Sequence, residues 1–568
     1  MIGCWNLVFV IGNFYLCTCN SQCNSQDLAI KSKEDVIFSL LREAIPLLYN
    51  YCMKKKLISL LTLLFFSLYF CNDYGVSSGP QSNTFIPDTL PAITIPVNNN
   101  LPLLEVGDGT ESGCSFEALE KAIDSLVKMK KGGSIRFLTG GKPITIPIIR
   151  SLKIVSPDSL LVIDGGNMIT LDGQNRCRII ECKNYARLVL ANIRLVNGIA
   201  DSSGGALLHP WYGTLACYNV TFVNNHCIAR GPEFGGGAVF AGGLDQAIFQ
   251  QCIFIGNSGS NGGAILNRGT NLKIDSCLFD RNIATGNGGG KDAGEAGKGG
   301  LGGGVYIDGM NYDMAEPFQL QKTTFCGNVS HCHGSAVFSY YYKNKPGISG
   351  ALIEQCSFND NVDSGTITST GTLYHEGAPL KLHSSTFAGN STLKHAGAIF
   401  LGPDANAEIV NCTFYRNKTP GNGGAIFGGR QNIVIWNCTF YGNEGSYGPA
   451  IFNDVADAVT IRNTLFVNNI PLLNQYAYRN CTATYTKGET VLQWPPEKVN
   501  GKPDNPCISE AVFIDPQIDS LAFNGGITRT MALAENSPAI GICDSCPPTD
   551  QCGVARKEKC DAGAFERR

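Results

Sequence analysis

The sequence predicts an all-β fold, a single right-handed parallel β-helix of about a dozen turns, and three observations lead to this prediction. Phe-x-x-Asn occurs nine times between Thr221 and Asn469, and the last five copies are 29, 27, 26 and 26 residues apart. Gly-Gly-Ala or a relative runs in phase ahead of it, as at Gly204 and Gly423. Between these motifs lie short β-branched and aromatic segments, which indicate strands joined by turns. A unit of this size buries an apolar face only by stacking on its neighbours.

The two repeated residues are predicted to point into the coil. Phe at one place in every turn stacks into an apolar column, and Asn three places on tolerates a left-handed turn and bonds the next turn through its amide. The Gly pair suits a corner that needs positive φ or close chain approach, and the crossover rule favours a right-handed coil. The predicted columns are Phe222, Phe254, Phe279, Phe325, Phe358, Phe387, Phe414, Phe440 and Phe466, with Asn225, Asn257, Asn282, Asn328, Asn361, Asn390, Asn417, Asn443 and Asn469.

Cysteine joins the repeat two places before five of the Phe residues, at Cys252, Cys277, Cys356, Cys412 and Cys438. Alternation along a strand puts Cys and Phe on the same face. An array of disulfides or metal ligands is one interpretation. We predict the other, in which the thiols are small buried core residues.

The repeat sets the predicted domain limits. We place the coil at residues 151–470, an N-terminal cap at 101–150 and a C-terminal cap region at 471–568. Ser115 is predicted to cap a helix that begins at Phe116, with Glu117 in its first turn. In the C-terminal region, disulfides are expected among Cys543, Cys546, Cys552 and Cys560; zinc or redox chemistry at the C-x-x-C pair is the alternative.

The N-terminal residues predict export. Met53-Lys54-Lys55-Lys56, the apolar stretch Leu57–Phe70 and Cys71 have the order of a signal peptide, so we assign it to residues 53–71. Residues 1–52 are interpreted as an extension upstream of the native start and residues 72–100 as a flexible tether. The end of this segment resembles a bacterial lipoprotein signal, although Phe70 departs from the usual small residue. The resemblance implies lipidation of Cys71; plain secretion is the alternative, and either places the protein outside the cell or on its surface.

Two family resemblances bear on function. The paired Gly-Gly-Ala and Phe-x-x-Asn repeats over residues 200–470 resemble those of the polymorphic outer-membrane proteins, which are surface adhesins. This chain departs from that family because no sustained alternating segments of membrane-barrel length follow Asn469.

The second resemblance is to bacterial choice-of-anchor β-helix surface proteins, and it implies surface display. Several pieces of their C-terminal pattern occur here in order. Cys552 replaces the Arg that usually follows Asp-Gln, and we expect it to be paired. The matching pieces are Asp515-Pro516, Asn524-Gly525-Gly526, Thr528-x-Thr530, Ser537-Pro538-Ala539-Ile540, Thr549-Asp550-Gln551, Gly553-Val554-Ala555-Arg556 and Cys560-Asp561-Ala562-Gly563-Ala564-Phe565-Glu566.

Charge and motif content narrow the function. A formal net charge of −3 gives no support for nucleic-acid binding. The pectin-lyase-like fold also hosts lyases and hydrolases, which need clustered carboxylates with a matching base. No such cluster follows the repeat, and Asp164 and Asp172 read as Asp-Gly turns. We therefore predict an adhesive, ligand-binding or structural monomer that binds carbohydrate or a host or matrix protein, without cofactor or metal. A polysaccharide lyase or glycoside hydrolase is the alternative.

Three local features keep two interpretations each. The Gly-rich insertion from Thr285 to Gly304 is expected to be a flexible loop, with polyanion or calcium binding as the alternative. Tyr340-Tyr341-Tyr342 is expected to cover the edge of a turn rather than to stack on sugars. His331 and His333 flank Cys332 and are read as a surface loop rather than a metal site. Seven Asn-x-Ser/Thr matches occur, including Asn219, Asn411 and Asn437, and several of them are interpreted as by-products of the repeat.

Overall fold

The structure, a computed structural model, describes residues 101–155, 159–288, 297–309, 318–342, 350–366, 370–473 and 478–568, and the backbone of 9–11 and 14–16. The chain divides into two compact units, Met1–Ile86 and Pro87–Arg568. In the first, β1 (Phe9–Ile11) pairs antiparallel with β2 (Phe14–Leu16). The predicted signal peptide, Cys71 and the tether lie outside the described residues.

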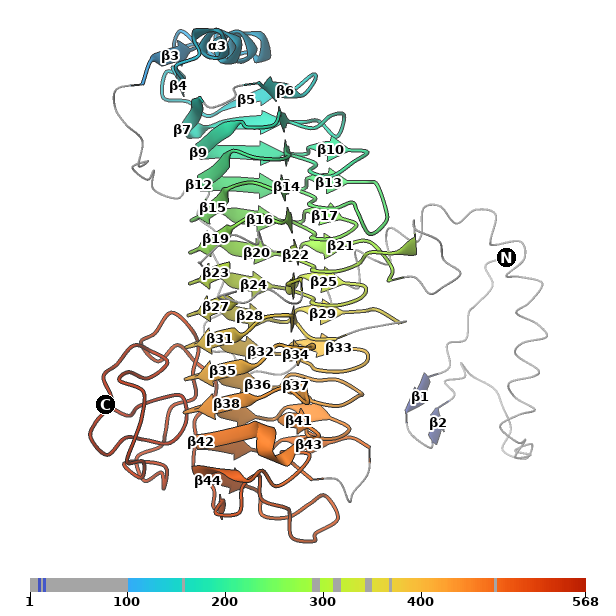
Figure 1. The fold of residues 1–568 in the computed structure, drawn as a ribbon, viewed down its shortest axis with the longest axis vertical. Helices are drawn as coiled ribbons and strands as arrows, with labels where there is room; N and C mark the ends of the chain where they lie inside the picture. Colours follow the sequence, from blue (N-terminus) through green and yellow to red (C-terminus); the bar gives the residue numbers. More distant parts are fainter. Residues whose placement is uncertain are drawn as a thin grey trace, which may run out of the picture. The chain divides into compact units, whose positions relative to one another are not determined.

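The second unit is a coil in which each complete turn adds one short strand to each of four ladders (Figure 1). All pairings between its named strands are parallel, and along the chain the order is ladder 1, 2, 3 and 4. Ladder 1 contains β6 (Leu152–Ile154), β8 (Ile180–Cys182), β11 (Leu207–His209), β14 (Val239–Gly242), β18 (Ile265–Arg268), β22 (Val305–Asp308), β26 (Val337–Tyr340), β30 (Leu373–Glu376), β34 (Ile399–Leu401), β37 (Ile426–Gly429) and β41 (Ile451–Asn453).

Ladders 2 and 3 adjoin each other, and the longest strands run through both. The long strands are β7 (Leu160–Asp172), β9 (Arg187–Val196), β12 (Thr214–Val223), β42 (Val459–Val467) and β44 (Lys487–Trp494). Ladder 2 also contains β3 (Leu103–Val106), β4 (Gly133–Phe137), β15 (Gln246–Gln250), β19 (Leu272–Asp275), β23 (Phe318–Gln321), β27 (Ala351–Glu354), β31 (Leu380–His383), β35 (Ala407–Val410) and β38 (Ile433–Trp436). Ladder 3 also contains β5 (Ile144–Pro147), β16 (Ile253–Ile255), β20 (Leu278–Asp280), β24 (Thr324–Cys326), β28 (Ser357–Asn359), β32 (Thr386–Ala388), β36 (Thr413–Tyr415), β39 (Thr439–Tyr441) and β45 (Val512–Phe513).

Ladder 4 is a row of two-residue strands at the remaining corner. It contains β10 (Ile199–Ala200), β13 (His226–Cys227), β17 (Ser258–Gly259), β21 (Ile283–Ala284), β25 (Val329–Ser330), β29 (Val362–Asp363) and β33 (Ser391–Thr392), with β40 (Glu444–Gly445) and β43 (Ile470–Pro471) as a separate pair. A short 3-10 turn, η3 (Ala456–Ala458), precedes β42. The predicted all-β parallel coil is confirmed.

The N-terminal helix is confirmed and the start of the coil is earlier than expected. Helix α3 (Phe116–Met129) begins at Ser115, whose hydroxyl accepts a hydrogen bond from the Ala118 amide, and it buries Phe116, Leu119 and Ile123. The helix lies at the end of the coil (Figure 1). However, β3 pairs with β4 and β4 with β7, so the parallel ladder already begins at residue 103 and not at 151. These strands carry no repeat motif, and therefore the spacing argument missed them.

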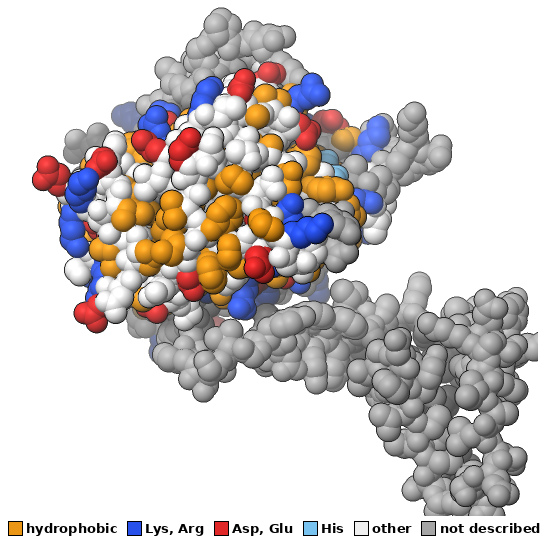
Figure 2. Space-filling view, turned by 90° about the horizontal axis from the view of Figure 1, so that it is seen from below, with side chains coloured by type: hydrophobic (Ala, Val, Ile, Leu, Met, Phe, Trp, Pro, Cys, Tyr) orange, Lys and Arg blue, Asp and Glu red, His pale blue; other side chains and the backbone are white. Residues whose placement is uncertain are grey.

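The other end of the coil also extends past its predicted limit. Strand β44 continues ladders 2 and 3 beyond residue 470, and β45 pairs with β44. A disulfide between Cys481 and Cys507, which the sequence did not indicate, ties this end together. Figure 2 views the molecule from below and shows apolar side chains gathered among charged ones at this end. On β45 and just after it, Val512 is 53% exposed and Ile514 38% exposed.

Candidate functional site

The repeated Phe and Asn residues lie inside the coil and serve the fold. The nine Phe side chains are fully buried and stack in one column, with neighbouring ring centroids 4.3–5.5 Å apart and planes 4–16° from parallel. Consecutive copies pair directly in ladder 3, as Phe325 does with Phe358. The residue just before each Asn has positive φ, for example Arg281 at 50° and Asp360 at 52°. The motif therefore encodes an inward ring, a left-handed corner and an inward amide.

The Asn side chains form a continuous ladder of hydrogen bonds. Each amide nitrogen donates to the side-chain oxygen of the Asn on the next turn and to a backbone carbonyl on the preceding turn, which belongs to Leu195 for Asn225 and to a Phe for the others. Thus Asn361 Nδ2 donates to Asn390 Oδ1 (3.0 Å) and to the Phe325 carbonyl (3.1 Å). The row ends at Asn480, which accepts from Asn469 Nδ2 at 2.9 Å and lies outside the Phe-x-x-Asn pattern.

The cysteines of the repeat are buried, unpaired core residues, as predicted. Cys252, Cys277, Cys356, Cys412 and Cys438 are 0–4% exposed and free. Thr323, Ser385 and Thr464 occupy the same place on other turns, and these side chains accept the backbone N–H of the preceding turn. Burial raises the pKa of the Cys356 thiol to about 12, so the thiolate needed for reaction is rare near neutral pH.

The C-terminal segment, residues 515–568, docks along the side of the coil, and we call it the strap. In Figure 1 its trace lies beside the later turns of the coil, next to β31, β35, β38 and β42. Gln551 exchanges side-chain hydrogen bonds with Thr386 and Thr413 on ladder 3, and Asn411 donates to the Thr549 carbonyl at 2.8 Å. The strap therefore covers the outer face of ladder 3 over the last turns.

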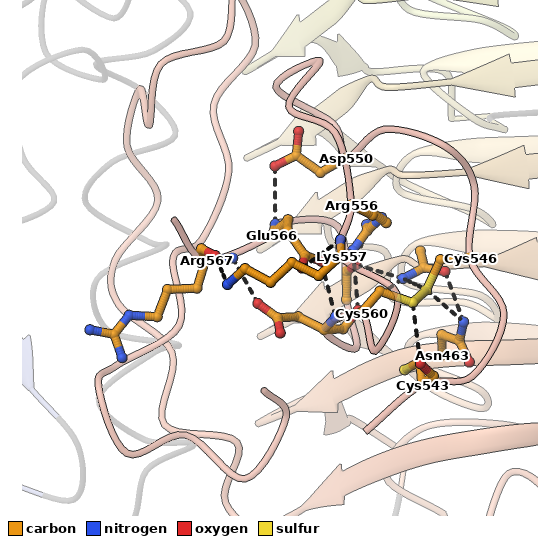
Figure 3. Close-up of polar contacts among 12 residues, drawn as sticks. Asn463, Cys543, Cys546, Asp550, Arg556, Lys557, Cys560, Glu566 and Arg567 are labelled. Carbon is orange, nitrogen blue, oxygen red and sulfur yellow. Dashed lines mark hydrogen bonds and ion pairs between the residues drawn. A yellow bond between two sulfur atoms is a disulfide. The ribbon is translucent and has the colours of Figure 1, made fainter. Parts of the chain in front are cut away.

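A buried polar network holds the strap together (Figure 3). Arg556 Nη1 pairs with Glu566 Oε2 at 3.0 Å, and both side chains are almost fully buried. Arg556 Nη2 reaches Asn411 Oδ1 at 2.9 Å, while Asp550 accepts the Glu566 amide at 3.0 Å. Asp550, Arg556 and Glu566 belong to the C-terminal pattern read in the sequence, so that pattern encodes docking.

The predicted disulfides in the strap are realised in part. Cys546 and Cys560 are bonded, whereas Cys543 is buried and free. Cys552, expected to be paired, is also free. Earlier in the chain, Cys177 and Cys182 are likewise unpaired.

Several of the longest intervals between strands adjoin the middle strands of ladder 1 in the sequence. The intervals before β14, β22 and β30 and after β22 and β26 are longer than the corresponding intervals in later turns. In one such later turn, only residues 430–432 separate β37 from β38. The described ends of the Gly-rich insertion are held against the coil, because the Gly286 and Gly300 amides both donate to the Ser260 carbonyl. We call the outer side of β18, β22, β26 and β30 the central face and take it as the candidate site.

An ion-pair cluster lies at one margin of the central face. Arg268 Nη1 is 2.9 Å from Glu233 Oε2, and Arg268 Nε is 3.2 Å from Asp308 Oδ2. Tyr342 donates its hydroxyl to Asp308 Oδ1 at 3.2 Å and is 39% exposed. Its ring occupies the space above Gly309, where a Cβ would lie 2.1 Å from Tyr342 Cε2. Two carboxylates thus surround one guanidinium beside an exposed phenol.

A row of aromatic rings runs along the central face and beyond it. Tyr306, Phe338 and Tyr374 stand on successive turns, with centroids 5.2 and 4.7 Å apart. The row continues through Phe400, Phe427 and Phe452. Tyr306, Phe338 and Leu266 form an apolar cluster separate from the main core. Because stacked rings cover each other's faces, a ligand meets mainly their edges and hydroxyls.

Burial shifts the pKa values of three side chains at the central face. Burial lowers the pKa of His333 to about 4, and its Nδ1 is 2.6 Å from Thr370 Oγ1. Burial also raises the pKa of Tyr306 and of Tyr374 above the usual phenol value. At neutral pH these side chains are therefore a neutral imidazole and two protonated phenols.

Other candidates from the sequence do not converge on a site. His331 Nδ1 contacts the Ala284 carbonyl at 2.8 Å, away from the Thr370 contact of His333. Asp164 and Asp172 accept hydrogen bonds from the backbone of their own turns. Across the described ranges, no group of three or more His, Cys, Asp or Glu side chains could hold a metal ion. Tyr341 is buried and donates to the Gly350 carbonyl, as expected of a residue covering a turn edge.

The glycosylation-like sequences are buried. Each of the seven Asn residues is 5% exposed or less: Asn219, Asn328, Asn390, Asn411, Asn417, Asn437 and Asn480. Asn328, Asn390 and Asn417 belong to the Phe-x-x-Asn repeat itself, which agrees with the interpretation of several matches as its by-products. None of the helices that the structure describes is long and apolar enough to cross a membrane.

Sequence reasoning missed the central face, although a signal existed. Two residues after the Ala of the Gly-Gly-Ala motif stands an outward aromatic on several turns, as at Phe240, Phe338, Phe400 and Phe427. The ion pairs had no such signal, because Glu233, Arg268 and Asp308 come from three separate turns.

Comparisons with known proteins agree with the fold. A family model described as the right-handed β-helix region matches residues 300–484. The chain is 26% identical over 264 residues to metabotropic glutamate receptor-like protein R of Dictyostelium discoideum, a match covering 44% of this chain and 14% of that protein. The chain thus matches only about a seventh of that relative's length.

Solved structures similar to this chain include enzymes and an adhesin. The alginate lyase AlyF-OU02 in complex with G6 has 12% identity and a TM-score of 0.37, covering 78% of this chain and 92% of the lyase. PfbA, a surface adhesin of Streptococcus pneumoniae, has 12% identity and a TM-score of 0.29, covering 77% and 99%. The parallel ladders and the match to the family model identify the fold as a right-handed parallel β-helix. The likeness to the lyase and the adhesin assigns no function to this chain.

Proposed function

We propose that the protein is an exported, surface-exposed β-helix that binds a ligand, a carbohydrate or a host or matrix protein, through the central face. The observation that supports this most is the Glu233–Arg268–Asp308 ion-pair cluster, which lies beside the exposed Tyr342 at the margin of the central face. The repeat places its Phe, Asn and Cys side chains inside the coil, so a partner meets the outward side chains of the ladders and corners instead.

The state of the central face favours binding over turnover. Arg268 is already paired with two carboxylates, so its positive charge is largely neutralised within the protein. General acid–base catalysis works best with a group whose pKa lies near the working pH. His333, with a pKa lowered to about 4, and the phenols of Tyr306 and Tyr374, with raised pKa values, are poorly matched to that task.

The disulfides support export. Cys481–Cys507 and Cys546–Cys560 would persist in an oxidising compartment and not in a reducing cytosol. We propose secretion or cell-surface display on this basis, together with the signal-like residues 53–71. Radioactive palmitate distinguishes the two forms, because a lipoprotein is labelled and its Cys71→Ala variant is not.

A binding and turnover experiment tests the role of the central face. Purified protein is assayed against pectin, alginate, glycosaminoglycan and matrix-protein panels, and unsaturated products and reducing ends are measured with and without Ca²⁺. We expect a ligand whose binding falls in Arg268→Gln and Tyr342→Ala. Arg462→Gln is the matched control, because Arg462 pairs with Glu489 on ladder 2 and is 47% exposed. Release of products at a steady catalytic rate would refute the binding role.

A further inference from the structure

A second aromatic group lies on the corner that follows ladder 1, upstream of the central face. Tyr185 belongs to the turn between β8 and β9, and Trp211 and Tyr212 to the turn between β11 and β12. Each of the three side chains is 50% exposed, in contrast to the buried Phe column. We call these three residues the aromatic corner.

The rings of the aromatic corner are held in place although they are exposed. Tyr185 and Tyr212 stack with centroids 4.8 Å apart and planes 10° from parallel. Trp211 lies against Gly243 of the next turn, where a Cβ would come within 2.1 Å of Trp211 Cε3. The turns are joined by backbone hydrogen bonds from the Tyr185 amide to the Trp211 carbonyl and from the Tyr212 amide to the Gly243 carbonyl. Fixed exposed rings lose little side-chain entropy when a ligand binds.

The size of the aromatic corner suits a small or narrow ligand. Half of the roughly 150–250 Å² of an aromatic side chain leaves about 300 Å² for the three rings together. A standard protein interface needs about 800 Å² on each partner. The surrounding side chains are polar: Lys183 and Glu181 form an ion pair, and Asn184 and Asp245 are exposed. Apolar rings within a polar rim match the apolar faces and the hydroxyl groups of a sugar.

The position of the aromatic corner points to a linear polymer. Tyr342 lies on the same corner of the coil, four turns beyond Tyr212, after β26. At about 4.8 Å per turn, the two are separated by roughly 19 Å along the coil. A chain of several sugar rings laid along the corner would reach from the aromatic corner to the central face.

We propose that Tyr185, Trp211 and Tyr212 form a subsite for a linear pyranose oligosaccharide that runs along the corner toward Tyr342. This inference rests on the proposed ligand-binding function and adds to it a ligand class and a second contact region. Trp211 and Tyr212 supply the stacking contacts, and Asn184 and Asp245 are placed to bond ring hydroxyls.

Titration with defined hexasaccharides tests the subsite. Cellohexaose, an alginate hexamer and a hyaluronan hexamer are titrated while tryptophan fluorescence and heat are recorded. We expect at least one to bind and to protect Trp211 from acrylamide quenching. Trp211→Ala and Tyr212→Ala should each weaken that binding about tenfold, as loss of a stacking contact does. Tyr447→Ala is the matched control, since Tyr447 is 40% exposed and lies before β41 rather than on this corner.

The outcomes separate the subsite from the central face. If no hexasaccharide binds at millimolar concentration, or if binding is unchanged in Trp211→Ala, the subsite is refuted. Loss of binding in Tyr342→Ala alone would also refute it and would leave the central face standing. Loss in the Trp211 and Tyr212 variants alone would support the subsite and remove the central face from the proposal. Circular dichroism checks that each variant is folded, which we expect because Trp211 and Tyr212 are 50% exposed and Tyr342 is 39% exposed.

Discussion

The hydrogen-bonded Asn ladder gives the most direct test of the fold. In Asn361→Ala, four side-chain hydrogen bonds disappear. Asn361 Oδ1 no longer accepts from the backbone amide of Asn328 (3.0 Å) or from its Nδ2 (2.9 Å). Asn361 Nδ2 no longer donates to the Phe325 carbonyl or to Asn390 Oδ1. All of these groups are buried, so water does not replace the missing partner.

The expected cost follows from those four bonds. A buried hydrogen bond contributes about 0.5–1.5 kcal/mol net, so the substitution should lower the free energy of unfolding by about 4 kcal/mol. That is a large share of the roughly 5–15 kcal/mol of a typical domain. Because each turn of a solenoid contacts only its neighbours, the loss should be concentrated around the turns of Phe325 and Phe358.

Urea unfolding and amide hydrogen exchange measure the effect. We expect the Asn328 amide to exchange faster in Asn361→Ala, because its acceptor is gone. Asn184→Ala is the control, since Asn184 is exposed and surface substitutions usually change stability by less than about 0.5 kcal/mol. A loss below about 1 kcal/mol with an unchanged Asn328 amide would refute the stabilising role of the ladder.

Three further predictions concern acid, close packing and the strap. Burial lowers the pKa of His375 to about 4, below the unfolded value near 6.5. The free energy of unfolding should therefore fall by up to about 3 kcal/mol as the pH drops from about 6.5 to about 4. An unfolding free energy that does not change with pH in the wild type, or that falls equally in His375→Gln, would contradict this. Gly237→Ala places a Cβ 2.3 Å from the Gly263 carbonyl oxygen. It should lower the melting temperature more than Gly269→Ala, where the added Cβ meets no atom within 4 Å and only the positive φ is unfavourable. Arg556→Met leaves Glu566 buried and unpaired and should cost about 3–5 kcal/mol, seen as rapid proteolysis of the strap; protection equal to wild type would count against the network.

The coil was predictable because its signals are local and repeated. In each Phe-x-x-Asn copy, the residue before the Asn has positive φ. The motif therefore forms the same corner on each turn, whatever the rest of the turn contains. The first strands, β3 and β4, escaped prediction because they join the ladder without the motif. Asn480 ends the amide ladder for a similar reason: its place is set by pairing with Asn469, not by spacing from a Phe.

The surface sites depended on contacts that sequence spacing does not report. Arg268 and Asp308 form an ion pair although the Gly-rich insertion separates them in the sequence. Tyr185 stacks on Tyr212 because β8 and β9 pair with β11 and β12 of the next turn. The sequence singled out the insertion after Asn282 and the Tyr340–Tyr342 segment separately. The structure shows that both flank ladder 1, which is why the central face is a candidate site.

By itself the sequence determined the parallel coil, its inward Phe, Asn and Cys columns and the helix that begins at Ser115, because each depends on residues close together in one repeat. Only the tertiary structure decided where the C-terminal segment goes. A cap was expected, but Arg556, Gln551 and their neighbours fasten the strap along ladder 3. The tertiary structure also decided which exposed side chains share a face, since that depends on the number of residues in each turn. The residues of the repeat determine the inward columns of the coil, and the lengths of the segments between strands determine which side chains lie together on its surface.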